Sequence, residues 1–242
     1  MEMRLVILTC LPSALARMLR AAGLGLALAA TAACTPQSAL LMNVLPAGTV
    51  PVLLSHLQGV DDSNRRRIAE LESRGDWQGL AQLAEENLAR DRNNADWWLV
   101  AGYAYSQLGQ HPRAAQCFGE MVRLAPDDML GWNLLAQSHR SAGEAARAVQ
   151  TLNSAVLVRK DVPATWFLLG ESYSDLGRFD PAAAAYREAL QLNGEFAQAW
   201  FGLGRAYARL GRADEFEKAA QTLQRLNPAL AKELAAMRPA AR

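Results

Sequence analysis

The sequence predicts an all-α protein in which pairs of helices stack side by side. Two periodic patterns carry this prediction. Glycine recurs every 34 residues, at Gly75, Gly109, Gly143, Gly177 and Gly211. Tryptophan recurs with the same period, at Trp98, Trp132, Trp166 and Trp200. A fixed period in this range is typical of repeats that cannot bury their apolar face alone and must stack on their neighbours.

A first helix is predicted around each tryptophan, because small or apolar residues follow three, four and seven positions later and so share one helix face. The four sets are Trp98/Ala101/Gly102/Tyr105, Trp132/Leu135/Ala136/His139, Trp166/Leu169/Gly170/Tyr173 and Trp200/Leu203/Gly204/Tyr207. The third member is always glycine or alanine, which predicts the close approach of a second helix. The periodic glycine then follows and is predicted to end the first helix in a left-handed cap.

A second helix is predicted after each of the first three of these helices from apolar residues at spacings of four and three. These sets are Ala114/Phe118/Met121, Ala148/Leu152/Ala155 and Ala182/Tyr186/Ala189. Pro126 and Pro228 close the first and fourth units, whereas Lys160 and Gly194 take this place in the second and third. In the fourth unit Phe216 replaces the small alanine, which indicates that the last pair packs differently.

This order of W-x2-L-G-x2-Y, then A-x3-F, then P, at a 34-residue period, resembles the tetratricopeptide repeat (TPR). The resemblance covers residues 95–230 in four units. It implies a right-handed α-solenoid of stacked helix-turn-helix pairs.

Both ends of the repeat array depart from the pattern. Residues 61–94 keep the apolar positions but carry Asn64 where tryptophan is expected, and we interpret them as a degenerate N-terminal unit. Residues 229–242 carry Leu230, Leu234 and Met237 at helical spacing, which predicts a short helix that covers the exposed end of the stack, followed by a tail.

Composition and motifs favour a binding protein over an enzyme. The formal net charge is +1, without the basic surplus that a nucleic-acid backbone requires. The histidines His56, His111 and His139 are far apart in sequence, and no glycine-rich phosphate loop, nucleophile elbow or metal-ligand spacing is present. We therefore predict no catalytic residue, no cofactor, no metal site and no nucleic-acid partner.

The first 33 residues have the three parts of a secretory signal peptide. A basic residue follows Met18, an apolar run covers residues 21–30, and small residues precede Cys34. A true start at Met18 would remove an overlong basic region. A cysteine directly after small residues resembles the lipobox of bacterial lipoproteins, which implies that Cys34 is acylated and becomes the mature N-terminus. Thr35 in place of aspartate implies, in that family, sorting to the outer membrane with the protein facing the periplasm. A soluble periplasmic protein and an inner-membrane anchor remain alternatives.

Residues 34–60, here called the tether, separate the proposed anchor from the repeats. Prolines interrupt apolar residues such as Leu40, Leu53 and Leu54. The tether docks on the first repeats, on the membrane surface or on a partner, and the first option is favoured because monomeric proteins seldom expose such apolar patches.

A groove is predicted next to the tryptophan stripe, from residues one, five and eight positions after each tryptophan on the same first helix. In the TPR family this stripe lines the concave face where peptides lie. The candidate groove residues are Tyr103, Asn133, Gln137, Arg140, Phe167, Glu171, Phe201, Arg205 and, one step further, Arg209. Arginine forks bind carboxylates at two points, so an extended peptide with an acidic end fits this set, although the Lys/Asn clamp of chaperone-binding TPR proteins is absent.

Together these patterns predict a membrane-anchored TPR scaffold or adaptor that helps to assemble a cell-envelope complex. Its layout is similar to that of pilotins, the TPR lipoproteins that escort pilus or secretion secretins, and to that of scaffolds of cell-wall machinery. A regulatory subunit that holds an envelope enzyme and a self-associating structural repeat protein remain alternatives. The sequence does not identify the partner or the oligomeric state.

Overall fold

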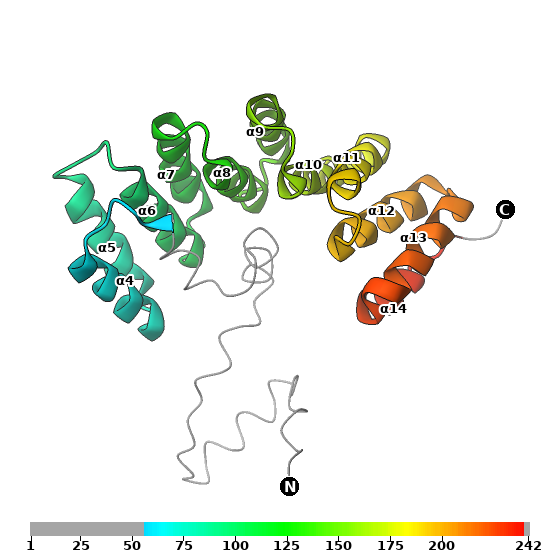
Figure 1. Cartoon of the computed structure of the whole chain (residues 1–242), viewed down its shortest axis with the longest axis horizontal. Helices are drawn as coiled ribbons and strands as arrows, with labels where there is room; N and C mark the ends of the chain where they lie inside the picture. The colour runs from blue at the N-terminus through cyan, green and yellow to red at the C-terminus, as the bar shows by residue number, and fades with distance from the viewer. Residues whose placement is uncertain (1–55, 240–242) are drawn as a thin grey trace, which may run out of the picture. The chain divides into compact units, whose positions relative to one another are not determined.

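The structure is a computed structural model that describes residues 56–239, and all regular secondary structure in this range is helical. The all-α solenoid predicted from the periodicity is confirmed (Figure 1). Helix α4 (Asp62–Arg74) pairs with α5 (Trp77–Leu88), and four further pairs and a last helix follow. These are α6 (Ala95–Gln107) with α7 (His111–Leu124), α8 (Met129–Ser141) with α9 (Ala145–Val158), α10 (Pro163–Asp175) with α11 (Phe179–Leu192), α12 (Ala197–Leu210) with α13 (Ala213–Leu226), and α14 (Pro228–Ala235).

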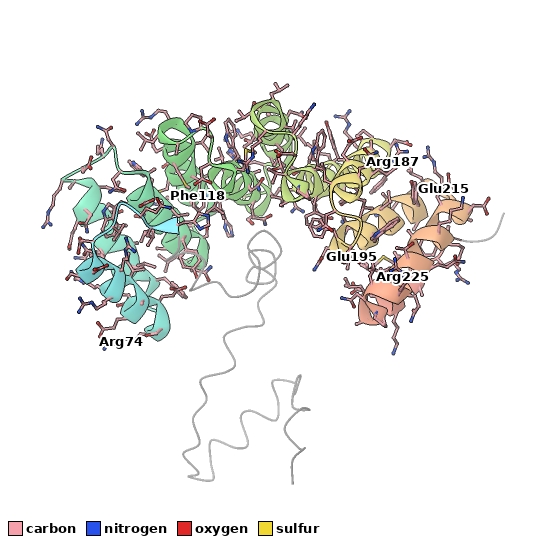
Figure 2. All side chains as sticks on the ribbon, viewed as in Figure 1. Arg74, Phe118, Arg187, Glu195, Glu215 and Arg225 are labelled. Carbon is pink, nitrogen blue, oxygen red and sulfur yellow. The ribbon has the colours of Figure 1, made fainter. Side chains whose placement is uncertain are left out.

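Each helix packs mainly on the helices before and after it in the chain. The first helices of neighbouring pairs also touch one another, α8 with α10 and α10 with α12, more closely than any two second helices do. The repeats therefore curve with the first helices on the inner side, while α7, α9 and α11 lie on the outer side (Figure 1). Charged side chains such as Arg187 and Glu215 point outward, whereas Phe118 lies between helices (Figure 2).

The five periodic glycines have the predicted left-handed backbone, with φ between 67° and 79°. In every pair the N–H of the residue after the glycine donates to the carbonyl five residues earlier, as in Gln110 to Tyr105 (2.9 Å) and Arg178 to Tyr173 (2.9 Å). This bond is the wide turn of a Schellman motif, which satisfies a carbonyl at the helix end. A left-handed φ favours glycine because it has no Cβ, so the 34-residue glycine period is a period of helix ends.

The periodic tryptophans are half-buried and hold the loops between units. Each indole Nε1 donates to the backbone carbonyl six residues earlier. The distances are 2.9 Å from Trp98 to Arg92, 2.8 Å from Trp132 to Pro126, 2.7 Å from Trp166 to Lys160 and 2.8 Å from Trp200 to Gly194. Because the acceptor is a backbone carbonyl, lysine and glycine serve where the family pattern has proline.

The close helix contacts predicted at the third stripe position are present. A Cβ added to Gly102 would lie 2.6 Å from the ring of Phe118, and one added to Gly170 would lie 2.6 Å from the ring of Tyr186. In the fourth unit the atom that would meet a Cβ on Gly204 belongs to Leu234 of α14. The last unit therefore packs differently, as Phe216 indicated.

Helix α14 covers one end of the stack, where it contacts α12 and α13. Leu234 is fully buried and Ala231 is 4% exposed, whereas Met237 is 39% exposed. The predicted apolar stripe therefore reaches Leu234 but does not include Met237, because α14 ends at Ala235.

The last residues of the tether pack on the repeats. Leu57 is fully buried and Val60 is 2% exposed within the core formed by the first two pairs. The N–H of Gly59 donates to Asp96 Oδ2 (2.5 Å), and Asn94 Nδ2 donates to the Gly59 carbonyl (3.0 Å). The packed unit thus begins before the predicted boundary at residue 61, and the rest of the tether lies outside the described residues.

The buried carboxyl group of Glu72 is a weak point in the first pair. Its side chain lies under α6, where the Tyr103 hydroxyl donates to Oε1 at 3.0 Å. Within residues 56–239, its Oε2 is the one fully buried side-chain oxygen or nitrogen that has no hydrogen-bond partner. Burial raises the pKa of Glu72 above its usual 4.5, and the Tyr103 bond opposes this only in part.

The substitution Glu72→Gln should therefore flatten the dependence of stability on pH. Because the pKa of Glu72 is raised in the folded state, the folded chain binds this proton more tightly than the unfolded chain, and stability falls as pH rises from 4.5 through the folded-state value. Glutamine has no charge to desolvate, so the variant should be the more stable protein above that range. Thermal unfolding at a series of pH values, with Glu86→Gln on the exposed side of α5 as control, measures this. Parallel curves for Glu72→Gln and the unchanged protein would contradict it.

Candidate protein-interaction groove

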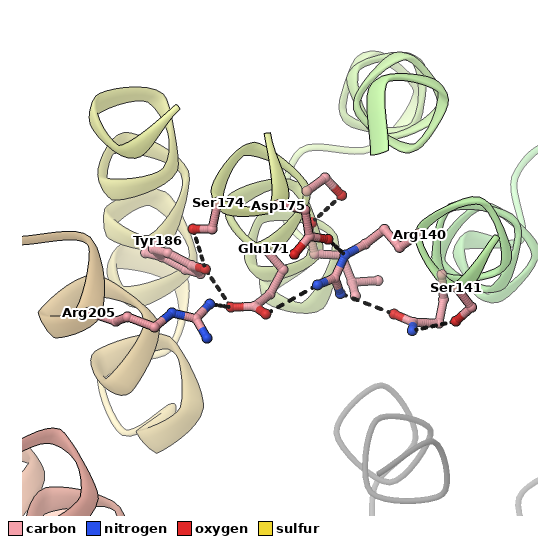
Figure 3. Close-up of polar contacts among 10 residues, drawn as sticks. Arg140, Ser141, Glu171, Ser174, Asp175, Tyr186 and Arg205 are labelled. Carbon is pink, nitrogen blue, oxygen red and sulfur yellow. Dashed lines mark hydrogen bonds and ion pairs between the residues drawn. The ribbon is translucent and has the colours of Figure 1, made fainter. Parts of the chain in front are cut away.

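The inner face brings together three of the predicted groove residues, each from a different unit. Arg140 extends from α8, Glu171 from α10 and Arg205 from α12 (Figure 3). Because Arg140 and Glu171 are 31 residues apart and Glu171 and Arg205 are 34 apart, their meeting follows from the stacking of the first helices. We call these three residues the central cluster.

Glu171 is the centre of this cluster. Its Oε1 accepts a hydrogen bond from Arg205 Nη2 (2.8 Å), and its Oε2 accepts one from Arg140 Nη2 (3.3 Å). The hydroxyl of Tyr186 on α11 also donates to Oε1, and Ser174 lies 3.2 Å from that hydroxyl (Figure 3). Only 14% of the Glu171 side chain is exposed, so this carboxylate links three units of the solenoid.

Arg140 is held on several sides. Its Nε donates to Asp175 Oδ2 (2.7 Å), and its Nη1 donates to Gln137 Oε1 (3.3 Å). The amide of Gln137 in turn contacts Ser141. With 9% of its side chain exposed, Arg140 has its guanidinium directed to groups of the protein itself.

Charges in this region are balanced, with Arg140 and Arg205 facing Glu171 and Asp175. Burial raises the pKa of Tyr186, and the charge of Glu171 raises it further, so its hydroxyl keeps its proton and donates to the carboxylate. For Arg205, burial acts to lower the pKa, but Glu171 outweighs burial and the net shift is upward. Arg205 is therefore a permanent cation.

Three predicted groove residues are buried, and their assignment as peptide contacts is wrong. Tyr103 is 8% exposed, Asn133 3% and Phe167 4%. Phe167 packs on Phe196 and Tyr186, with ring centroids 5.0 Å and 6.0 Å apart. The Oδ1 of Asn133 accepts a hydrogen bond from the Thr165 hydroxyl (3.0 Å).

The physical reason is the contact between neighbouring first helices, which closes over the position next to each tryptophan. Tyr103 is covered in a similar way, by Trp77 in an edge-to-face contact at 5.7 Å and by Glu72. Sequence spacing gave the correct helix face but not how deeply the neighbouring repeat covers it.

Accessible groove residues lie at the C-terminal part of the inner face. Phe201 is half-buried, 35% of the Arg205 side chain is exposed, and Arg209 is exposed. The Arg205 guanidinium lies 6.0 Å from the Phe201 ring centre, and that of Arg209 lies 5.4 Å from the Phe179 ring centre. Arg212 is paired with Asp180 at 2.7 Å. We call Phe201, Arg205 and Arg209 the aromatic-basic patch.

The sequence interpretation missed Asp175 and Tyr186, which complete the surroundings of the central cluster. A signal for Asp175 was present, because Arg140 and Asp175 are opposite charges 35 residues apart, close to one repeat period. Tyr186 belongs to a second helix and occupies the usual large aromatic position, so nothing in its spacing distinguished it. Cys34 lies outside the described residues.

Other kinds of site are not found in residues 56–239. No group of three or more His, Cys, Asp or Glu side chains there could hold a metal ion. No helix in that range combines the length and the apolar character that a membrane span requires.

Comparisons with known proteins agree with this architecture. A family model described as tetratricopeptide repeat matches residues 99–163 and 167–231, more than half of the 242 residues. The fold is similar to that of MamA (TM-score 0.61, 23% identity, 67% of this chain and 95% of that chain covered). It is also similar to YrrB, described as a TPR protein with an unusual peptide-binding site (0.59, 15%, 78% and 98%). TTC0263, a thermophilic TPR protein in Thermus thermophilus, is similar as well (0.54, 20%, 71% and 95%). No curated protein matches the sequence.

Proposed function

Because the chain belongs to the tetratricopeptide repeat family, we propose that it is a protein-interaction scaffold whose inner face binds an extended acidic segment of a partner protein. The observation that carries this proposal is the aromatic-basic patch, which leaves an aromatic surface and two arginines accessible at one end of the groove. Arginine recognises carboxylates through paired N–H donors, and aromatic side chains supply large contact area.

The binding mode follows from the geometry. Arg205 is shared between Glu171 and the open groove, since one edge of its guanidinium bonds to Glu171 while about a third of the side chain is exposed. Arg209 has no carboxylate partner among the described ion pairs, so it is available to an acidic ligand. YrrB, which has a similar fold, is described as having a peptide-binding site, and this supports a peptide as the class of ligand.

The substitution Phe201→Ala should weaken peptide binding by about 2 kcal/mol, the loss typical of an aromatic hot spot. A fluorescein-labelled synthetic peptide that ends in Asp and Glu residues is the probe, and its anisotropy gives the affinity. The control is Gln191→Ala, on the exposed side of α11. Phe167→Ala is expected to act instead on stability, because Phe167 is buried. Unchanged affinity in Phe201→Ala would exclude the aromatic-basic patch as the binding surface.

The proposal extends to the cell envelope. The apolar run before Cys34, the small residues between them and the proline-rich tether support a lipid-anchored protein of the outer membrane that faces the periplasm, with a soluble periplasmic or inner-membrane form as the alternative. There the repeats would organise an envelope complex, such as secretin or cell-wall machinery. A regulatory subunit of an envelope enzyme and a self-associating repeat protein remain the rival functions.

The substitution Cys34→Ser should abolish lipid attachment, because it removes the thiol that would be acylated. Cells grown with radiolabelled palmitate should label the unchanged protein and the control Cys117→Ser, but not Cys34→Ser. Label that persists in Cys34→Ser would remove the anchoring proposal and leave the groove proposal untouched.

A further inference from the structure

A cavity of about 580 Å³ opens on the outer side of the repeats, between α5, α6 and α7. It lies away from the inner face and shares no residue with the central cluster or the aromatic-basic patch. Its apolar lining includes Leu88, Trp98, Ala101, Tyr105 and Cys117. None of the functions proposed above uses it.

The cavity exists because the first full unit lacks a side chain that the other three have. Ala101 occupies the place of Leu135, Leu169 and Leu203 in the tryptophan stripe. Across the cavity Gly119 on α7 also lines the space, and a Cβ added there would meet no atom within 4 Å. One leucine-sized hollow is therefore specific to this unit.

Polar groups around the cavity are satisfied within the protein. The hydroxyl of Tyr105 donates to Glu85, and Arg113 donates to the same carboxylate at 3.2 Å while its guanidinium lies 4.0 Å from the Tyr105 ring centre. Burial raises the pKa of the Cys117 thiol to about 11, so this wall carries a neutral thiol. The remaining demand of the cavity is for an apolar side chain.

The described chain begins beside this cavity. Gly59 is hydrogen-bonded to Asn94 and Asp96, and the cavity-lining residues Arg92 and Trp98 lie two residues to either side of that pair. Residues 35–55, which precede, contain no charged residue and include the run Val52, Leu53 and Leu54. Five residues of extended chain span about 17 Å, so this run can reach the cavity from Gly59.

We propose that the cavity is filled in cis by the apolar run at residues 52–54. The buried Leu57 and Val60 show that the segment directly after this run already packs on the same core. A short connection keeps the run at high effective concentration, which favours this occupant over a separate chain. The tether is thereby held on the outer side of the first full unit, and the inner face stays free for a partner.

The test is proximity cross-linking in the full chain with Cys10→Ser, Cys34→Ser and Leu53→Cys, so that Cys117 is the remaining native thiol. Mild oxidation should give an intramolecular disulfide between residues 53 and 117, identified by peptide mass spectrometry. The matched control places the cysteine at Ser38, further along the tether, and should react at least ~10-fold more slowly because its effective concentration at the cavity is lower.

Ala101→Leu, which restores the residue of the other units, should fill the cavity and reduce cross-linking by ~10-fold, about 1.4 kcal/mol of lost occupancy. A thermal melt shows whether this variant is folded. Independently, Val52→Asp with Leu54→Asp changes no described residue and should make Cys117 alkylation faster.

Cross-linking that is unaffected by Ala101→Leu would overturn the proposal. So would a disulfide that forms only between two chains, which would identify a second copy as the occupant. Loss of the cross-link on addition of phosphatidylglycerol vesicles would identify the membrane as the preferred site of the run and would also overturn it.

Discussion

Gly170→Val is expected to destabilise the protein by about 3 kcal/mol, at the upper end of what overpacking costs. A Cβ at this position would lie 2.6 Å from Cε1 and 2.7 Å from Cδ1 of Tyr186. The ring cannot retreat, because Gly202 on α12 approaches it from another first helix, and a Cβ there would lie 2.6 Å from Cζ. Two glycines thus leave room for one fully buried tyrosine ring.

Thermal unfolding should show a fall in midpoint of about 6–12 °C for a domain of this size. The matched control is Ala184→Val, which introduces the same branched side chain on the exposed side of α11. Arg187→Ala, also exposed (Figure 2), should be nearly neutral.

Gly170→Ala separates the close contact from helix propensity. Propensity alone would stabilise the alanine variant by about 1 kcal/mol, whereas the contact with Tyr186 predicts a loss. An alanine variant more stable than the unchanged protein would show that α10 and α11 do not approach as described.

The fold was accessible from the sequence because its rules are local and repeated. A left-handed cap favours glycine wherever it occurs, and Gly75 marks a helix end although its unit has Asn64 in place of tryptophan. The tryptophan period marks loops held by an indole N–H, which needs only a backbone carbonyl. These requirements act within one unit, so a single unit shows them.

The groove was less accessible because it depends on contacts between units. Spacing placed Phe167 on the correct face of α10, but its burial depends on Phe196, which follows the next unit's second helix. Similarly, the sequence shows arginines in the groove but not that Glu171 already pairs with two of them. Met237 failed for a related reason, since α14 ends before reaching it.

Glu171 gives the groove a built-in competitor for acidic ligands. Its carboxylate occupies part of Arg205 and of Arg140, and any carboxylate of a partner that approaches Arg205 must share the guanidinium with it. The same contacts join three units. The central cluster therefore ties the stability of the inner face to its affinity for an acidic partner.

The second large effect follows from this competition. Glu171→Gln keeps an acceptor for Tyr186 but removes the negative charge, so the affinity for the labelled acidic peptide should rise by about tenfold, or 1.4 kcal/mol. Charge reversal of Arg205 together with Arg209 should lower the affinity by at least as much. Both effects should shrink as salt is added, because exposed charges are screened over about 8 Å at physiological ionic strength.

Fluorescence anisotropy at a series of salt concentrations measures both variants, with a peptide in which Asn and Gln replace Asp and Glu as the ligand control. Glu188→Gln on the exposed side of α11 removes the same charge outside the groove and should leave the affinity unchanged. Thermal melts confirm that each variant is folded. The opposite signs of the two changes are the decisive point, because a general loss of structure would weaken binding in both. If Glu171→Gln weakens binding as the arginine reversals do, the central cluster serves only to join the repeats, and the inner face does not select an acidic peptide.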